Sequence, residues 1–231
     1  MVYPSILFRD RHDAGLQLAE AIAAELHSLT VTPTATPVVY ALPKGGLPVA
    51  EPISQRLGCP LDLVVAKKVT RPDNPELAIG AVTADGYVIR SRQASLVRSS
   101  LGNWRTALSQ AQSKAKQQQA QFNAVYAPVS PEGAIAILVD DGIATGMTMA
   151  VAARSLLAKR PAALLICAPV APEPLLNELK RWCDRVVILA TPPNFLSVSR
   201  FYIDFHQVEM EEAIACLQRQ RLRLEMAESA N

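Results

Sequence analysis

The sequence predicts an α/β protein in which a parallel sheet is flanked by helices, with a β-hairpin and one long helix added to it. Short apolar, β-branched runs alternate with segments whose apolar residues recur at helical spacing, and this alternation is typical of a parallel sheet covered on both faces. Half of the 231 residues are apolar, so the chain can bury a large core. Because the chain shows no repeat and no boundary between regions of different composition, we expect a single domain over residues 1–231.

Local patterns predict the individual elements. Strands are expected at 38–42, 61–65, 135–139, 163–168 and 185–189. Helices are expected at 13–29 with Asp13 as N-cap, from the PKGG stretch to Gly58, from about 147 to 159, at 172–182, and from about 209. Polar N-caps, glycine after the last turn, and apolar residues at every third or fourth position indicate these helices.

A hairpin and a long helix are expected between the second and third strands. The stretch IGAVTADGYVIR predicts two antiparallel strands, because Asp85-Gly86 suits a two-residue type I′ turn. A polar helix over 96–126 carries apolar residues on one narrow seam: Val97, Leu101, Trp104, Leu108, Ala111 and Ala115. Such a seam favours packing against one neighbouring helix, either in the same chain or in the partner subunit of a homodimer.

Charge and composition exclude several classes of function. The chain carries 23 basic and 21 acidic residues, and this near balance does not favour binding to nucleic acid or to an anionic membrane. No apolar run reaches the roughly 20 residues of a membrane span, and the start MVYPSILFRD lacks the pattern of a signal peptide. The four cysteines form no CxxC pair and are expected to be reduced. We therefore expect a cytoplasmic protein.

The stretch AILVDDGIATGMT carries the strongest chemical signal. Asp140 and Asp141 follow a predicted strand, and a loop of small residues leads from them into a helix. In such sheets, ligands bind outside the carboxyl ends of the strands. Small residues let backbone N–H groups surround a phosphate at a helix N-terminus, whereas the two carboxylates can accept hydrogen bonds from a vicinal diol. A ligand with a ribose diol and a 5′-phosphate would satisfy both parts of the motif.

This stretch resembles the phosphoribosyl-pyrophosphate (PRPP) binding signature of type I phosphoribosyltransferases, and the similarity runs from FRDRHDAG to FYIDF. The resemblance implies a type I phosphoribosyltransferase-like fold, catalytic roles for Asp140 and Asp141, and PRPP binding by the loop after them. That loop comprises Gly142, Ile143, Ala144, Thr145, Gly146, Met147 and Thr148. Gly142 departs from the apolar residue that is commonest in the family at this position, although it looks similar to bacterial members.

A second loop, ALPKGGLPVA, also follows a strand and opens a helix. It resembles the pyrophosphate loop of the same family, which implies that Lys44, Gly45 and Gly46 bind the diphosphate of PRPP. The resemblance further implies a cis peptide bond between Lys44 and Gly45, presenting backbone N–H groups to the diphosphate. Small bacterial phosphoribosyltransferases that look similar overall usually have arginine where Lys44 stands.

The segment VVAKKVTRPDNPELAIGAV is basic and precedes the hairpin. A solvated basic loop is one reading of it. The resemblance places a mobile flap in this segment, and its residues Lys67, Lys68 and Arg71 would neutralise the charge that develops on departing pyrophosphate. The charged, proline-bearing stretch 68–76 has the composition of a mobile lid. On this reading the three basic residues are catalytic.

Near the C-terminus, RFYIDFHQ resembles a segment of purine-type enzymes in which an aromatic residue lies by the base and an aspartate helps to hold Mg²⁺. The resemblance therefore implies a magnesium cofactor, with Asp204 and Asp140 as its protein contacts. An ordinary exposed acid at the end of a strand is the alternative for Asp204.

The activity implied is transfer of the 5-phosphoribosyl group from PRPP to a nitrogen of a small-molecule acceptor, with release of pyrophosphate. The aromatic FYIDF segment favours a nucleobase as acceptor. The competing interpretation is a PRPP-binding regulatory protein that has no turnover. A recognisable helix-turn-helix module or a basic face would favour a nucleic-acid-binding regulator, and the sequence indicates neither.

Overall fold

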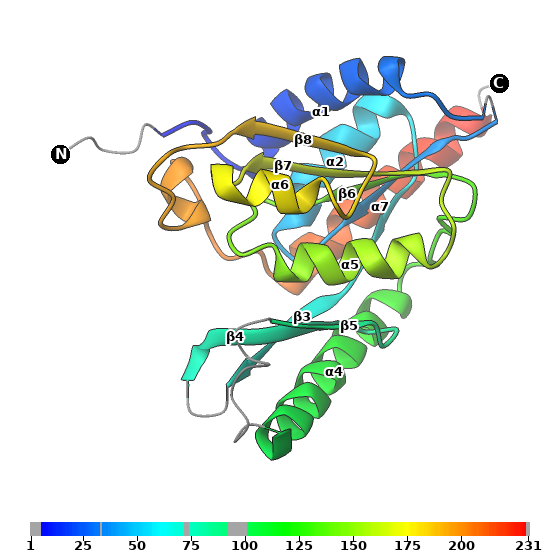
Figure 1. The fold of residues 1–231 in the computed structure, drawn as a ribbon. Coiled ribbons are helices and arrows are strands. Elements are labelled where there is room, and N and C mark those ends of the chain that lie inside the picture. The colour runs from blue at the N-terminus through cyan, green and yellow to red at the C-terminus, as the bar shows by residue number, and fades with distance from the viewer. Residues whose placement is uncertain (1–5, 33, 72–73, 92–100, 230–231) are drawn as a thin grey trace.

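The computed structural model describes residues 6–229, apart from 33, 72–73 and 92–100. Its centre is a five-stranded parallel sheet in the order β2-β1-β6-β7-β8 (Figure 1). The strands are β1 (Pro37–Ala41), β2 (Leu61–Leu63), β6 (Ile135–Val139), β7 (Ala163–Val170) and β8 (Arg185–Ala190). The predicted α/β class and the parallel sheet are confirmed, with small shifts at the ends of the strands.

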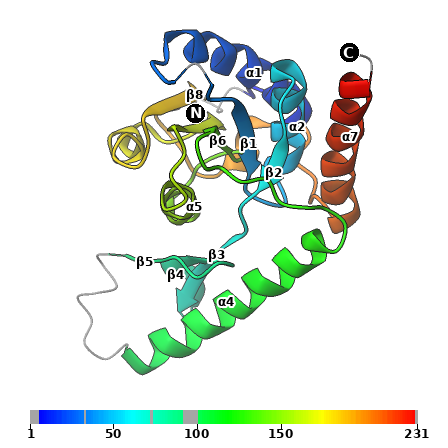
Figure 2. The same ribbon diagram turned by 90° about the vertical axis from the view of Figure 1, so that its right-hand side faces the viewer.

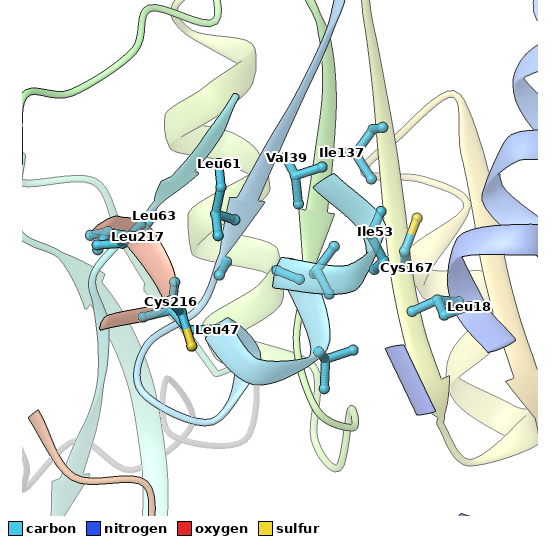
Figure 3. Close-up of a cluster of buried hydrophobic side chains, with 14 of the residues drawn as sticks. Leu18, Val39, Leu47, Ile53, Leu61, Leu63, Ile137, Cys167, Cys216 and Leu217 are labelled. Atoms are coloured by element: carbon cyan, nitrogen blue, oxygen red, sulfur yellow. The ribbon is translucent and has the colours of Figure 1, made fainter. Parts of the chain in front are cut away.

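Helices cover both sides of the sheet (Figures 1 and 2). One side carries α1 (Arg11–Ser28), α2 (Gly46–Leu57) and α7 (Met210–Ser229). The other side carries α5 (Met147–Leu157), the 3₁₀ turn η2 (Glu173–Leu175) and α6 (Leu176–Leu179). Alternate strand residues such as Val39, Ile137 and Cys167 pack under the first group, and Figure 3 shows them beside Ile53 of α2. The residues between them, such as Leu138, pack under α5. The central strands β6 and β7 are therefore buried on both faces and form continuous apolar runs.

Two predicted helix boundaries are wrong. The N-cap of α1 is Asp10 rather than Asp13, since the Asp10 carboxylate accepts the backbone N–H of Asp13 at 2.8 Å. The helix predicted at 172–182 is reduced to η2 and the single turn of α6. The chain leaves α6 early because Asp184 exchanges two hydrogen bonds with the backbone of Leu164, which returns the chain to the sheet before β8.

A second, antiparallel sheet extends from the end of β2. Its strands are β3 (Ala66–Arg71), β4 (Asn74–Thr83) and β5 (Val88–Arg90), in the order β3-β4-β5. The predicted type I′ turn is wrong, because such a turn needs positive φ at both central residues and only Gly86, at φ 97°, has it. The β4–β5 connection instead closes on hydrogen bonds between Thr83 and both Gly86 and Tyr87.

Within its own chain, the long helix α4 (Leu101–Asn123) packs on this antiparallel sheet rather than on a helix, so the prediction of a helix partner in the same chain is wrong (Figure 2). Packing against a partner subunit stays a prediction. Ala107 and Ala111 of α4 are buried against a hydrophobic cluster on the sheet that comprises Val69, Ile79 and Val82. Gly80 makes the contact close, since a Cβ there would lie 2.6 Å from the ring of Trp104. The predicted start of the helix, 96–100, lies outside the described residues.

Within the part of the chain that the structure describes, no helix combines the length and the apolar character that crossing a bilayer demands. The predicted cytoplasmic location stays a prediction.

Candidate active site

The acid pair lies at the carboxyl end of β6, between β1 and β7. The backbone N–H of Asp141 donates to Asp140 Oδ1 at 2.9 Å, so the two residues form a tight local turn. Burial, reinforced by the neighbouring Asp141 carboxylate, raises the pKa of Asp140 well above its usual range. A buried carboxylate beside a second one is a strong acceptor that needs a donor or a cation to stay ionised.

Asp141 is held both at its carboxylate and at its backbone oxygen. Its Oδ2 accepts a hydrogen bond from Arg11 Nε at 2.8 Å, and both side chains are largely buried, with 9% and 15% exposed. Its backbone oxygen accepts the hydroxyl of Tyr202 at 2.6 Å. Burial raises the pKa of the Asp141 carboxyl, and the Arg11 guanidinium opposes that shift. The carboxylate is therefore locked in place through Oδ2, while Oδ1 takes no part in the ion pair.

The Lys44 loop packs directly against the acids. A Cβ on Gly45 would lie 2.2 Å from Asp141 Oδ2, and one on Gly46 would lie 2.9 Å from the backbone oxygen of Val139. Only glycine lets the loop approach the acid pair this closely. Lys44 Nζ lies 3.4 Å from the carboxylate oxygen Oε2 of Glu209, the residue before α7. The ammonium group of Lys44 is thus at the edge of the Lys44 loop.

The cis peptide bond implied between Lys44 and Gly45 is wrong: the cis bond joins Pro43 and Lys44. Gly45 already has helical backbone angles (φ −60°, ψ −31°) as the N-cap of α2, so the turn out of β1 is made one residue earlier. Among the described residues, no acceptor takes the N–H groups of Lys44 and Gly45. A loop that leaves backbone donors unpaired at a helix N-terminus suits an anion.

The loop after the acids begins buried, is exposed at its middle, and becomes buried again where it enters α5. Gly142 and Ile143 are buried, and the N–H of Ile143 donates to Val170 of β7 at 2.9 Å. Ala144 and Thr145 are exposed, and Gly146 enters α5 as an N-cap with φ 71° and no side-chain cap. Met147 and Thr148 form the first turn of α5, whose N–H groups have no partner inside the helix. This part of the loop offers unpaired donors to a phosphate, as the sequence motif predicts.

The structure explains why residue 142 is a glycine. A Cβ at this position would lie 2.4 Å from Val198 Cγ1 and 3.1 Å from Val170 Cγ1. Val198 begins the 3₁₀ turn η3 (Val198–Phe201), which occupies the space that an apolar side chain would need. The departure from the commonest family residue is thus matched by a bulky neighbour.

We expect Gly142→Ala to lower the melting temperature and to weaken PRPP binding, because overpacking at this site costs about 1–3 kcal/mol and displaces the phosphate loop. The double variant Gly142→Ala/Val198→Ala should recover most of both losses, since it removes the side chain that clashes. Thermal unfolding with and without PRPP measures the effect, and Val198→Ala alone is the control. A double variant that loses as much as the two single variants summed would contradict the packing explanation.

The three basic residues of the predicted flap lie on β3. Strand alternation puts Lys67 and Lys68 on opposite faces of the antiparallel sheet. Lys67 is half-buried, and burial, followed by the charges of Lys44 and Lys114, lowers its pKa. Lys67 is therefore close enough to Lys44 and to Lys114 of α4 for their positive charges to act on it.

Lys68 lies on the side of the acid pair. Its charge is one of those that favour ionised Asp140, and its side chain lines a cavity of about 630 Å³ together with Thr145 and Met147 of the phosphate loop. Arg71 is exposed at the end of β3, opposite Asn74. Of the predicted flap, 72–73 lie outside the described residues, while both flanks are paired strands.

Asp204 is exposed, and its Oδ1 accepts the backbone N–H of His206 at 3.2 Å. No group of three or more His, Cys, Asp or Glu side chains in the described ranges has metal-site geometry. Asp140 and Asp204 are thus at most two protein contacts for a cation, not a complete site.

Sequence reasoning missed Arg11 and Tyr202 as parts of the site. Both contact Asp141, although they lie in FRDRHDAG and FYIDF at the two ends of the chain. Their only signal in the sequence is that both stretches belong to the family resemblance. An arginine within a predicted helix start carries no local mark of a distant carboxylate partner.

The arrangement as a whole consists of a buried acid pair at the end of a central parallel strand, a glycine loop on one side and an uncapped helix N-terminus on the other. These features define an α/β protein of the phosphoribosyltransferase type. The chain belongs to the family described as the phosphoribosyl transferase domain, whose model matches residues 10–206.

Individual relatives agree with this assignment. The chain is 36% identical over 219 residues to two Mycobacterium tuberculosis proteins, MT0597 and Rv0571c, which are provisionally named phosphoribosyl transferases. The match covers 92% of this chain but 47% of each relative, so the chain spans about half the length of these curated relatives. The solved structure of TT1426 from Thermus thermophilus is similar with a TM-score of 0.76 and 32% identity, covering 93% of this chain and 99% of that one.

Proposed function

We propose that the protein is a Mg²⁺-dependent phosphoribosyltransferase that moves the 5-phosphoribosyl group of PRPP to a nitrogen of a small acceptor, in our interpretation a nucleobase, and releases pyrophosphate. One observation carries the proposal. The partly buried acid pair lies between two loops with unpaired backbone N–H groups among the described residues, one at Lys44 and Gly45 and the other at the N-terminus of α5.

The two loops fit the two phosphate groups of PRPP. The loop at 144–148, with the N-terminus of α5, would hold the 5′-phosphate through N–H groups and the hydroxyls of Thr145 and Thr148. The Lys44 loop, with Lys67 beside it, would hold the diphosphate. The ribose then lies over Asp140 and Asp141, whose carboxylates can accept hydrogen bonds from the 2- and 3-hydroxyl groups.

The reaction would be a displacement at the anomeric carbon. The C–O bond to pyrophosphate breaks with its electron pair leaving on the phosphate oxygen, and the lone pair of the acceptor nitrogen forms the new C–N bond. The acceptor nitrogen then loses its proton. Positive charge develops on the ribose in between, as in glycoside hydrolysis. Asp140 and Asp141 would stabilise that charge, and Lys44, Lys67 and Lys68 would stabilise the charge on pyrophosphate.

The residues present fit a magnesium ion that arrives with its substrate. Mg²⁺ in phosphate sites commonly uses one or two carboxylates, several waters and the phosphate oxygens themselves. Asp140 and Asp204 would supply the carboxylates, and the described residues show no fuller cage. When bound, the ion neutralises the diphosphate and makes it a better leaving group.

The decisive experiment incubates the protein with PRPP and Mg²⁺ and offers a panel of purines, pyrimidines and other amines, while pyrophosphate release is followed. Release with one class of base supports the enzyme and identifies the acceptor. PRPP binding without release for any acceptor would support the PRPP-binding regulator instead. Failure to bind PRPP at all, judged by an unchanged melting temperature at saturating PRPP and Mg²⁺, would rule out both.

We expect alanine at Lys67, Lys68 or Arg71 to lower kcat by more than it raises the KM for PRPP. The reason is that charge on pyrophosphate is greatest in the transition state, so groups that meet it there contribute little to ground-state binding. Steady-state kinetics of the three single variants measure this split. Lys116→Ala is the control, because Lys116 is exposed on α4 and lines a different cavity. If every flap variant changed KM alone, the transition-state role would be wrong.

A further inference from the structure

Arg11, the first residue of α1, makes contacts that a helix-start arginine does not need. Its Nε donates to Asp141 Oδ2 at 2.8 Å, and its Nη1 donates to the backbone oxygen of His206 at 2.7 Å. Its Cζ lies 3.7 Å from the centroid of the Phe205 ring. The planar guanidinium thus makes three separate contacts. Two of its N–H groups donate hydrogen bonds, and its face packs on an aromatic ring.

The segment that Arg11 contacts is bound to the N-terminal residues along its length. We call residues 7–11 together with 201–206 the terminal clasp. Within it, backbone N–H groups of Leu7 and Phe8 donate to Phe201, and those of Ile203 and Asp204 donate back to Phe8 and Arg9, all at 2.8–3.0 Å. Phe8 and Tyr202 also pack ring against ring at 5.3 Å. The terminal clasp fixes residues 201–206, which we propose to lie near the acceptor, relative to α1.

The clasp meets the ribose acid at one residue. Tyr202 holds the backbone of Asp141 and Arg11 holds its carboxylate, while Gly45 lies against the same Oδ2 from the diphosphate side. The position of Asp141 Oδ1 is therefore determined jointly by the N-terminal helix, the 201–206 segment and the Lys44 loop. Any movement of Arg11 would therefore shift both Asp141 and the 201–206 segment.

We propose that Arg11 is a positioning residue that joins Asp141 to the 201–206 segment, so that the ribose and the acceptor are held in one fixed relation. This inference rests on the proposed function. The guanidinium of Arg11 already contacts Asp141, His206 and Phe205. Arg11 therefore acts through Asp141 rather than on the substrate. Precise relative placement matters because a displacement of about 1 Å between reacting groups can lower a rate about 100-fold.

The test compares Arg11→Lys and Arg11→Met with Arg56→Met. Arg56 of α2 is the control, since its side chain is 53% exposed, it pairs with Glu20, and it lies outside the terminal clasp. We expect Arg11→Lys to lower kcat about 100-fold, by the displacement argument above, and to change the Kd for PRPP by far less. Lysine keeps the charge but cannot reach Asp141 and His206 with one planar group. Arg56→Met should match the unaltered protein.

A double-mutant cycle separates positioning from general structural support. If Arg11 acts through Asp141, adding Arg11→Met to Asp141→Asn should lower kcat no further than Asp141→Asn does. Losses that add would overturn the inference, as would an Arg11→Lys variant with unchanged kcat. Should Arg11→Met not fold, the cycle is run with Arg11→Lys.

The inference can fail separately from the proposed function. If no acceptor releases pyrophosphate, turnover is wrong, but the joining role of Arg11 predicts faster hydrogen exchange at the amides of Ile203 and Asp204 in Arg11→Lys, and weaker PRPP binding. Exchange and binding that both match the unaltered protein would then overturn the role of Arg11.

Discussion

Replacing Asp140 with asparagine is expected to abolish turnover and weaken PRPP binding without lowering the melting temperature of the ligand-free protein. Asparagine keeps the Oδ1 that accepts the Asp141 N–H, so the local turn survives. Loss of a charged acceptor for a hydroxyl group weakens binding by about 1.5–3 kcal/mol, and loss of charge stabilisation lowers kcat by about 100- to 1000-fold. Calorimetric titration with PRPP and Mg²⁺, together with kinetics, measures both.

The expected stability follows from the sign of the pKa shift. Burial raises the pKa of Asp140 in the folded state, so its contribution to stability is present at low pH and is lost as pH rises through the folded pKa. At neutral pH the raised pKa of the Asp140 carboxyl in the folded state therefore lowers the stability of the protein, and asparagine removes that cost. Thermal unfolding at pH 4 and pH 7 should show a relative gain for Asp140→Asn at about pH 7 only.

Asp141→Asn is the matched control, and it should behave differently. This change removes the partner of the largely buried Arg11, and an uncompensated buried charge costs about 3–5 kcal/mol. We therefore expect a clear fall in melting temperature as well as lost binding. Equal melting temperatures for Asp140→Asn and Asp141→Asn would contradict this difference between the surroundings of the two carboxylates.

Gly45→Ala is expected to cost both PRPP binding and stability. The new Cβ would lie 2.2 Å from Asp141 Oδ2 and 2.9 Å from its Cγ, so either the Lys44 loop or the Asp141–Arg11 pair has to move. Overpacking of this kind costs about 1–3 kcal/mol, and the displacement separates the diphosphate loop from the ribose acid. We expect the Kd for PRPP to rise about 100-fold, the loss that a misplacement of about 1 Å can cause.

Gly58→Ala is the control for the effect of a methyl group on a helix-end glycine. Gly58 has φ 60°, and a Cβ at this position would meet no other atom within 4 Å, so alanine there costs only about 1–2 kcal/mol of backbone strain. Its affinity for PRPP should be unchanged. If Gly45→Ala bound PRPP as well as Gly58→Ala does, close packing of the loop on the acids would not be needed for binding.

Much of the site is predictable because its main parts are local in the sequence. The acid pair, the small loop after it and the start of α5 all lie within 140–148. The spacing of apolar residues that predicts a strand followed by a helix is read over a similar length. The same holds for the Lys44 loop between β1 and α2. The family resemblance then implies that these parts bind one ligand together.

Other predictions are wrong for reasons that a local sequence pattern does not show. The long helix was expected to pack on a helix because its seam is narrow, but Gly80 opens a place for Trp104 on the antiparallel sheet. The cis peptide bond was expected one residue too late, because Gly45 is already the N-cap of α2. Neither the glycine partner of an aromatic ring nor the exact end of a turn is visible in a local pattern.

The sequence by itself determined the α/β class, the parallel sheet and the loops that face the proposed ligand, because hydrophobic period and helix-start chemistry act between near neighbours. Only the tertiary structure decided which residues hold the acids. Arg11 and Asp141 are separated by 130 positions, and Tyr202 and Asp141 by 61. Such pairs form only when the packing of the sheet and helices brings distant segments of the chain together. The local spacing of apolar residues does not predict these contacts.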